Sequence, residues 1–124
     1  MVQVDPSEYL TTFIFSKNQF SLLNGRVKKY AFIPPKHRRL SVFRISELAD
    51  HEVWEIGEKV GILRELPLLA RADITVLSVN NAGLYIDADD NPPHHANIVG
   101  WHEKDSEIKL KATELAESAQ LYVK

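Results

Sequence analysis

The chain has 124 residues, of which 44% are hydrophobic and 26% are charged, and its net charge is −2. These values are typical of a folded globular protein and exclude the polar, highly charged composition of a disordered chain. The length suits one domain, which we expect to span residues 1–124.

The N-terminus reads Met1-Val2-Gln3-Val4-Asp5-Pro6 and holds neither the basic nor the apolar segment of a secretion signal. No apolar run approaches the length of a membrane span, so we expect no contact with a membrane. The absence of cysteine excludes disulfides, thiolate metal sites and cysteine nucleophiles, and it fits a reducing compartment. These observations predict a cytoplasmic protein.

Three β-type runs occur in the first half of the chain. Residues 9–15 are rich in aromatic and β-branched residues and indicate a strand, with a helix as the alternative. Residues 27–33 and 40–45 are similar runs, separated by Pro34-Pro35. Because proline donates no ladder hydrogen bond, this pair breaks any continuous strand, and the two runs are candidates for antiparallel neighbours.

Residues 47–60 are predicted to form an amphipathic helix, with Ser46 as its N-cap. Gly57 and Gly61 each cost about 1 kcal/mol relative to Ala inside a helix, so we expect the helix to end near residue 59. Trp54 lies off the apolar stripe of this helix. The stripe itself consists of Ala49, Val53, Ile56, Val60 and Leu63, spaced as on one helical face.

The second half of the chain predicts a hairpin followed by a helix. Residues 73–79 are nearly all apolar and indicate a buried strand, and a turn at 80–83 leads into a second run at 84–86. The last helix is expected at about 105–120, with an apolar stripe opposite its charged residues. That stripe contains Ile108, Ala112, Leu115, Ala116 and Ala119.

The predicted fold class is α+β: a mostly antiparallel sheet with two amphipathic helices, at about 47–60 and 105–120, packed on one of its faces. Strands outnumber helices and do not alternate with them regularly, which argues against a doubly wound parallel sheet. A barrel-like variant of the sheet is the alternative. The periodicities place eight residues in the core: Ala49, Val53, Ile56, Ile74, Val76, Ile108, Ala112 and Leu115.

Residues 87–102 concentrate groups that can carry chemistry, namely three aspartates and three of the five histidines. Such groups can act as acid and base in hydrolysis or as metal ligands. Adjacent His94 and His95 point to opposite sides of an extended chain, so only one of them should join a site. We predict no metal and no cofactor, because nothing fixes the ligand spacing, and a solvated loop is the alternative interpretation. The catalytic candidates are His95 and His102 with one of Asp87, Asp89 or Asp90.

The stretch 93–101 also has the features of a small polar pocket. His95 and Asn97 fall on one face of an extended segment. Gly100 permits a bend or a close backbone approach, and Trp101 supplies a large anchor. We therefore count His95, Asn97 and Trp101 as candidate binding residues.

A second candidate site is basic. Residues 17–44 hold eight Lys or Arg and no Asp or Glu, with aromatic residues among them. Cations contact phosphates and exposed aromatics stack on unpaired bases, so the region suits a phosphate or nucleic-acid ligand. The alternative is a solvated face paired with the acidic second half of the chain. The candidate binding residues are Arg26, Lys28, Lys29, Lys36, Arg38, Arg39 and Arg44.

Three functions follow, in the order that the sequence favours them. The first is a binding or protein-interaction module, which uses surface such as Trp54 to hold a partner or a second copy of the chain. The second is phosphate or nucleic-acid recognition through the basic region 26–44. The third is a small hydrolase that uses the cluster 87–102. Glycine-rich phosphate loops and common hydrolase and kinase motifs are absent from the sequence, which is why an enzyme comes last.

Overall fold

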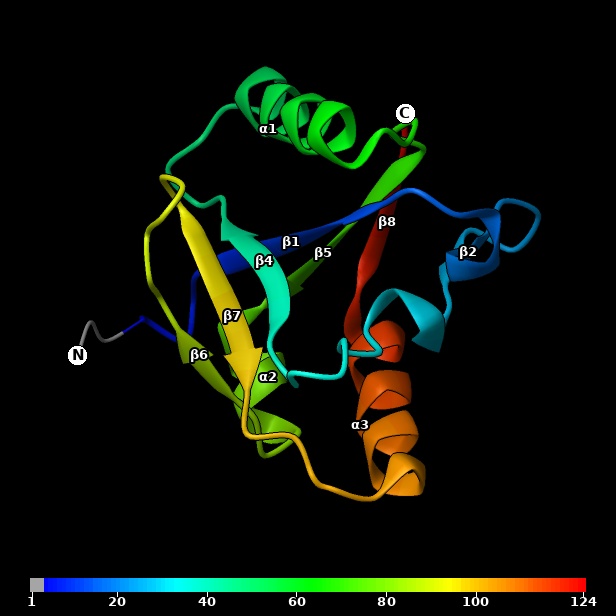
Figure 1. Ribbon diagram of the computed structural model, residues 1–124, viewed down its shortest axis with the longest axis vertical. Helices are drawn as coiled ribbons and strands as arrows, with labels where there is room; N and C mark the ends of the chain where they lie inside the picture. The colour runs from blue at the N-terminus through cyan, green and yellow to red at the C-terminus, as the bar shows by residue number, and fades with distance from the viewer. Residues whose placement is uncertain (1–3) are drawn as a thin grey trace.

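A computed structural model describes residues 4–124 and shows a central six-stranded sheet (Figure 1). Its order is β6-β7-β4-β1-β5-β8, and every neighbouring pair is antiparallel. The sheet stays open, with β6 and β8 at its edges. The strands are β1 (Tyr9–Ile14), β4 (Leu40–Arg44), β5 (Ala70–Thr75), β6 (Tyr85–Asp87), β7 (His95–Val99) and β8 (Gln120–Val123). The prediction of a mostly antiparallel α+β fold is confirmed.

Three α-helices, one more than predicted, accompany the sheet within residues 4–124. They are α1 (Asp50–Arg64), α2 (Val76–Asn81) and α3 (Asp105–Ser118). A small pair, β2 (Phe20–Ser21) and β3 (Arg26–Val27), and two 3-10 helices, η1 (Lys17–Gln19) and η2 (Lys29–Ala31), fill the connection from β1 to β4. None of the helices in this part of the chain is long and apolar enough to cross a membrane. Residues 1–3, part of the N-terminal stretch considered in the sequence analysis, lie outside the described residues.

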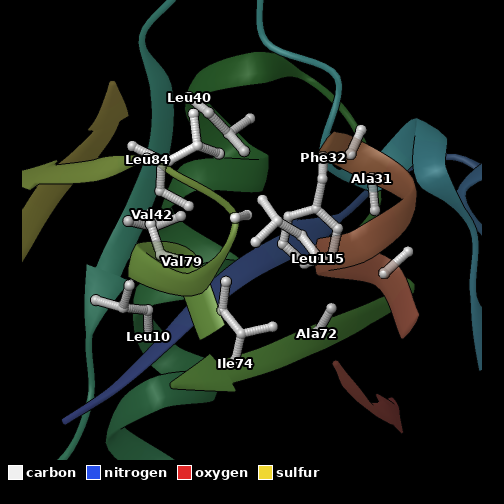
Figure 2. Packing of buried hydrophobic residues seen from close by; sticks show 14 of the residues in the cluster. Leu10, Ala31, Phe32, Leu40, Val42, Ala72, Ile74, Val79, Leu84 and Leu115 are labelled. Carbon is white, nitrogen blue, oxygen red and sulfur yellow. The ribbon is translucent and has the colours of Figure 1, made fainter. Parts of the chain in front are cut away.

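The helices cover both faces of the sheet, whereas we expected them to pack on one face only. Because side chains alternate across a strand, Leu10 and Val42 point to one face and Phe13 and Phe43 to the other. The first pair belongs to the larger core, together with Leu115 of α3 and Val79 of α2 (Figure 2). The second pair packs with α1 in a smaller cluster that contains Val53, Ile45 and Leu68. Figure 1 shows α1 at the top of the view and α2 and α3 at the bottom.

Helix α1 starts and ends later than predicted. Its N-cap is Ala49, which is exposed and not in the core, while the Ser46 hydroxyl accepts a hydrogen bond from the Tyr9 backbone amide instead. Both glycines lie inside the helix and are buried. At Gly57 a Cβ atom would come within 2.7 Å of the Phe13 ring and 2.8 Å of Leu68. Glycine is needed there for close packing of α1 on the sheet, which offsets its low helix propensity.

The predicted hairpin at 73–86 is wrong. Strand β5 ends at Thr75, whose side chain caps α2 by accepting a hydrogen bond from the Ser78 backbone amide at 3.2 Å. The apolar run therefore splits between the end of a strand and the start of a helix, and periodicity alone cannot separate these in a fully buried segment. After α2 the chain enters β6, which pairs with β7 and not with β5.

The predicted strand at 27–33 is also largely absent. Of the predicted range only Val27 belongs to a strand, β3, which pairs with β2. The following residues form η2 and place Phe32 fully in the core beside α3, so burial of this aromatic residue is achieved without a strand. Strand β4 pairs with β1 and β7. The other core predictions hold: Val53, Ile74, Val76, Ile108, Ala112 and Leu115 are buried, and Ile56 is half-buried.

Candidate active site

The face of the sheet that carries α1 is apolar beneath the helix and polar beside it. Ser41 of β4 lies opposite Asn97 of β7, and two residues further along β4 Phe43 lies opposite His95. All four side chains therefore point to the same face. Phe43 belongs to the cluster under α1, and its ring meets the His95 imidazole edge-on at 5.3 Å between centroids. The polar residues thus sit at the margin of a packed region.

Ser41, His95 and Asn97 form a continuous hydrogen-bonded chain together with Asp89 of the loop before β7. Ser41 Oγ lies 2.7 Å from His95 Nε2, and His95 Nδ1 lies 2.7 Å from Asp89 Oδ1. The Asn97 amide donates to the second Asp89 oxygen at 3.2 Å. An ionised carboxylate only accepts hydrogen bonds, so Nδ1 of a neutral imidazole carries the proton and Nε2 accepts from the Ser41 hydroxyl.

Asp89 reaches His95 because the loop between β6 and β7 folds back on itself. The Asp90 amide donates to the His95 carbonyl at 2.9 Å, and the Asp90 carboxylate accepts from the His94 amide at 2.8 Å. Desolvation of Asp89 opposes its ionisation, but hydrogen bonds from the His95 side chain, the Asn91 amide and the Asn97 side chain outweigh it. The pKa of Asp89 therefore lies below its usual value, and the carboxylate is fully ionised at neutral pH.

Ser41, His95 and Asn97 line a cavity of about 520 Å³. Its apolar walls include Phe13 of β1 together with Tyr30, Pro34 and Pro35 from the segment that precedes β4. Its remaining polar lining includes His37, Arg39 and Arg64. Ser41 and His95 are partly exposed, so a small molecule in the cavity can contact both.

The structure brings together only some of the residues that the sequence singled out. His95 and Asn97 share one face, as expected, and Asp87 lies beside them in an ion pair with Arg39. His102 is exposed on the segment after β7, where its Nδ1 accepts from the Lys104 amide, and it does not line the cavity. Trp101 is buried in the main core and donates to the Ile98 carbonyl, so it is no anchor of the pocket.

The other histidine of the pair, His94, faces a different cavity. It lies there with Asp90 and with Arg44, whose guanidinium makes two hydrogen bonds of 3.0 Å to the Glu8 carboxylate. These hydrogen bonds raise the pKa of Arg44 against the opposing effect of its desolvation. The expectation that His94 and His95 point apart is met.

The basic region does not form a single surface. Arg44 is paired with Glu8 and Arg39 with Asp87. The Arg38 guanidinium donates to the Glu103 carbonyl. The other basic candidates line two separate cavities against α3. One cavity contains Arg26, Lys28 and Lys29, and the other contains Lys36 together with Arg38.

Ser41 is the site residue that the sequence analysis missed. It lies in the predicted strand 40–45, and its partner His95 is 54 residues away in the chain. The alternation of Arg39, Ser41 and Phe43 on one strand face was the available signal. It carries no information on which strand pairs with β4.

Neither the fold nor this site can be assigned by comparison. Within residues 4–124, no group of three or more His, Asp or Glu side chains is placed to hold a metal ion. Comparison with protein-family models, with curated proteins and with solved structures found no match to this chain.

Proposed function

We propose that this protein is a hydrolase that cleaves small esters or related acyl compounds, with Ser41 as nucleophile, His95 as general base and Asp89 as the positioning residue. The observation that supports it is the hydrogen-bonded chain Ser41 Oγ, His95 Nε2, His95 Nδ1, Asp89 Oδ1, with both separations at 2.7 Å. Serine hydrolases of unrelated folds share this order of groups, and the arrangement is recognised by its geometry.

The chemistry follows from the proton positions. His95 Nε2 accepts the hydroxyl proton while Ser41 Oγ bonds to the acyl carbon of the substrate. The imidazolium then returns this proton to the leaving alcohol as the bond between the acyl carbon and the alcohol oxygen breaks. Water, deprotonated by the same nitrogen, then attacks the acyl carbon of the ester on Ser41. The imidazolium returns this proton to Ser41 Oγ as the bond between Oγ and the acyl carbon breaks, which releases the acid and restores the serine.

Asp89 and Asn97 support this cycle from behind the histidine. The Asp89 carboxylate holds the proton on Nδ1 and stabilises the imidazolium that forms when Nε2 takes up a proton. The Asn97 amide fixes the second carboxylate oxygen and so keeps Asp89 in line with the ring. Arg39, two residues before Ser41, lines the same cavity and supplies positive charge for the oxyanion that develops on the substrate.

Steady-state hydrolysis of 4-nitrophenyl acetate by the purified chain tests the proposal. Ser41→Ala and His95→Ala should each lower kcat by about a thousandfold or more, because the nucleophile and its base act as a unit. His102→Ala is the matched control: its imidazole lies outside the cavity, and activity should be unchanged. Equal rates for wild type and Ser41→Ala would refute the assignment.

Asp89→Asn separates positioning from folding. It should lower kcat by about a hundredfold to ten-thousandfold with little change in KM, because Asn stabilises neither the required tautomer nor the imidazolium. The thermal unfolding midpoint should stay near that of the wild type, since Asp89 lies at the surface. If kcat falls only together with the thermal unfolding midpoint, Asp89 has a structural role instead.

The other two functions expected from the sequence stay predictions. The interaction module rested on Trp54, which is half-buried and packs against Arg71. Polyanion binding rested on a continuous basic surface, and the structure divides those side chains among several cavities. Neither therefore gains support comparable to that of the hydrogen-bonded chain at Ser41.

A further inference from the structure

The cavity in front of Ser41 has walls of one charge sign. Arg39 comes from the segment before β4 and Arg64 is the last residue of α1, so two separate parts of the chain bring a guanidinium to the same space. His37 adds a third nitrogen group. Among the described residues, no Asp or Glu lines this cavity.

Arg64 is available to a ligand. Its side chain is exposed, and its guanidinium lies 5.3 Å from the centre of the Phe15 ring, a cation–π contact that orients the guanidinium but leaves its positive charge uncompensated by a carboxylate. Within residues 4–124 it makes no ion pair with a carboxylate, whereas Arg39 is paired with Asp87 at the cavity margin. Arg64 is therefore the stronger anchor for an incoming anion.

Four other cavities in the described part of the chain lack this combination. Those against α3 each contain an acidic residue, Glu117 in one and Asp105 in the other. The cavity beside His94 holds several carboxylates, and the cavity beside Arg71 holds Asp50 and Asp73. Among these five cavities, the space in front of Ser41 is the one that combines basic side chains, a nucleophile and walls free of carboxylates.

We infer that the substrate of this site is an ester whose acyl part carries an anionic group, a carboxylate or a phosphate, held by Arg64. The inference rests on the proposed hydrolase function and adds the substrate class to it. The apolar walls formed by Phe13, Pro34 and Pro35 accept the carbon chain between the anion and the scissile bond. A guanidinium suits either anion because its N–H groups match two oxygens at once.

The test compares two esters of equal chain length, 4-nitrophenyl hexanoate and the mono-4-nitrophenyl ester of adipic acid, which differ by a terminal carboxylate. Rates are measured at low salt and corrected for hydrolysis without protein. We expect kcat/KM to favour the anionic ester by about tenfold or more, the effect of one charged hydrogen-bonding partner. Added salt should reduce this preference, because ions screen exposed charges.

Arg64→Gln should abolish most of the preference, because it should raise KM for the anionic ester about tenfold more than KM for the hexanoate. Arg26→Gln, an exposed arginine in a different cavity, is the control and should keep the preference. Hydrolysis of both esters at equal kcat/KM would overturn the substrate class and leave the hydrolase in place. No hydrolysis of either ester would overturn the hydrolase, and the substrate class with it.

Discussion

Two polar networks lie on the same face of the sheet, one beside α1 and one beneath it. The first is Ser41, His95 and Asp89, which borders an open cavity. The second is centred on Arg71 of β5, whose side chain is only 4% exposed and ion-pairs with Asp73 and Asp50. Its guanidinium lies between the rings of Trp54 and Tyr122, 5.0 Å from each centre.

The networks differ in how well their polar atoms are satisfied. Along the first, each group has a hydrogen-bonding partner at 2.7 to 3.2 Å. In the second, Arg71 Nε lies 3.4 Å from Asp73 Oδ1 without hydrogen-bonding geometry, and neither atom has another partner among the described residues. Both are buried. The comparison assigns chemistry to the satisfied network beside Ser41. It assigns a structural role to the network around Arg71, where aromatic rings and opposite charge hold a buried cation in place.

Removing the buried cation should have the largest effect on stability. Arg71→Met leaves Asp73 in the interior without its counter-charge, and we expect the free energy of unfolding to fall by about 3–5 kcal/mol. Urea denaturation at neutral pH measures it. The double variant Arg71→Met with Asp73→Leu should recover most of the loss, because no buried charge is left. A loss below about 1 kcal/mol in the single variant would remove the structural role.

The packing of α1 that separates the two networks depends on Gly57. Gly57→Ala should lower the free energy of unfolding by about 1–3 kcal/mol through overpacking against Phe13 and Leu68, even though Ala favours a helix by about 1 kcal/mol. Urea denaturation measures this change as well. The control is Glu55→Ala at an exposed position of the same helix, for which we expect the free energy of unfolding to change by no more than about 0.5 kcal/mol. A stabilised Gly57→Ala variant would show that α1 sits less closely on the sheet.

The aspartates of the two networks should respond to pH in opposite directions. Burial of Asp73 raises its pKa above 3.8, and it outweighs the hydrogen bond from Thr11 and the charge of Arg71. Folding favours the protonated form of this group, so its contribution to stability is full below pH 3.8 and is lost as pH rises through its raised pKa. For Asp89, with a lowered pKa, the contribution is full above 3.8 and is lost as pH falls through the folded value.

Unfolding free energies of the wild type, Asp73→Asn and Asp89→Asn, measured between about pH 2 and pH 6, sharpen this contrast. The wild type should lose stability relative to Asp73→Asn as pH rises and gain it relative to Asp89→Asn. The difference in unfolding free energy between the wild type and each variant should therefore change with pH in opposite directions. A change in the same direction for both variants would show that the two aspartates do not differ in the way that their burial implies.

Elements with a clear local sequence pattern were predicted well, and elements decided by tertiary packing were not. Helix α3 carries a strong local pattern and was predicted closely, and β1 agrees with the strand that was favoured over a helix at residues 9–15. The errors at Gly57 and Thr75 have a common cause, since tertiary packing decided whether a helix continued or a strand ended. Local propensity is a weak guide in buried segments.

The site was predictable only in part, for a similar reason. His95 and Asn97 were placed on one face by strand alternation, and Asp89 was among three aspartates named beside them. Ser41 could not be paired with His95 because the strand order β7-β4-β1 is not encoded in the spacing of either segment. Arg39 and Arg64 likewise meet only through the fold.

Covalent labelling with a fluorophosphonate tests the central claim most directly. The reagent requires a nucleophilic serine, and the account predicts one adduct per chain, located on Ser41 by peptide mass spectrometry. Labelling should be lost in His95→Ala, slowed in Asp89→Asn and retained in His102→Ala. An intact protein without adduct, or labelling of Ser41 that persists unchanged in His95→Ala, would contradict the assignment of this network as a catalytic site.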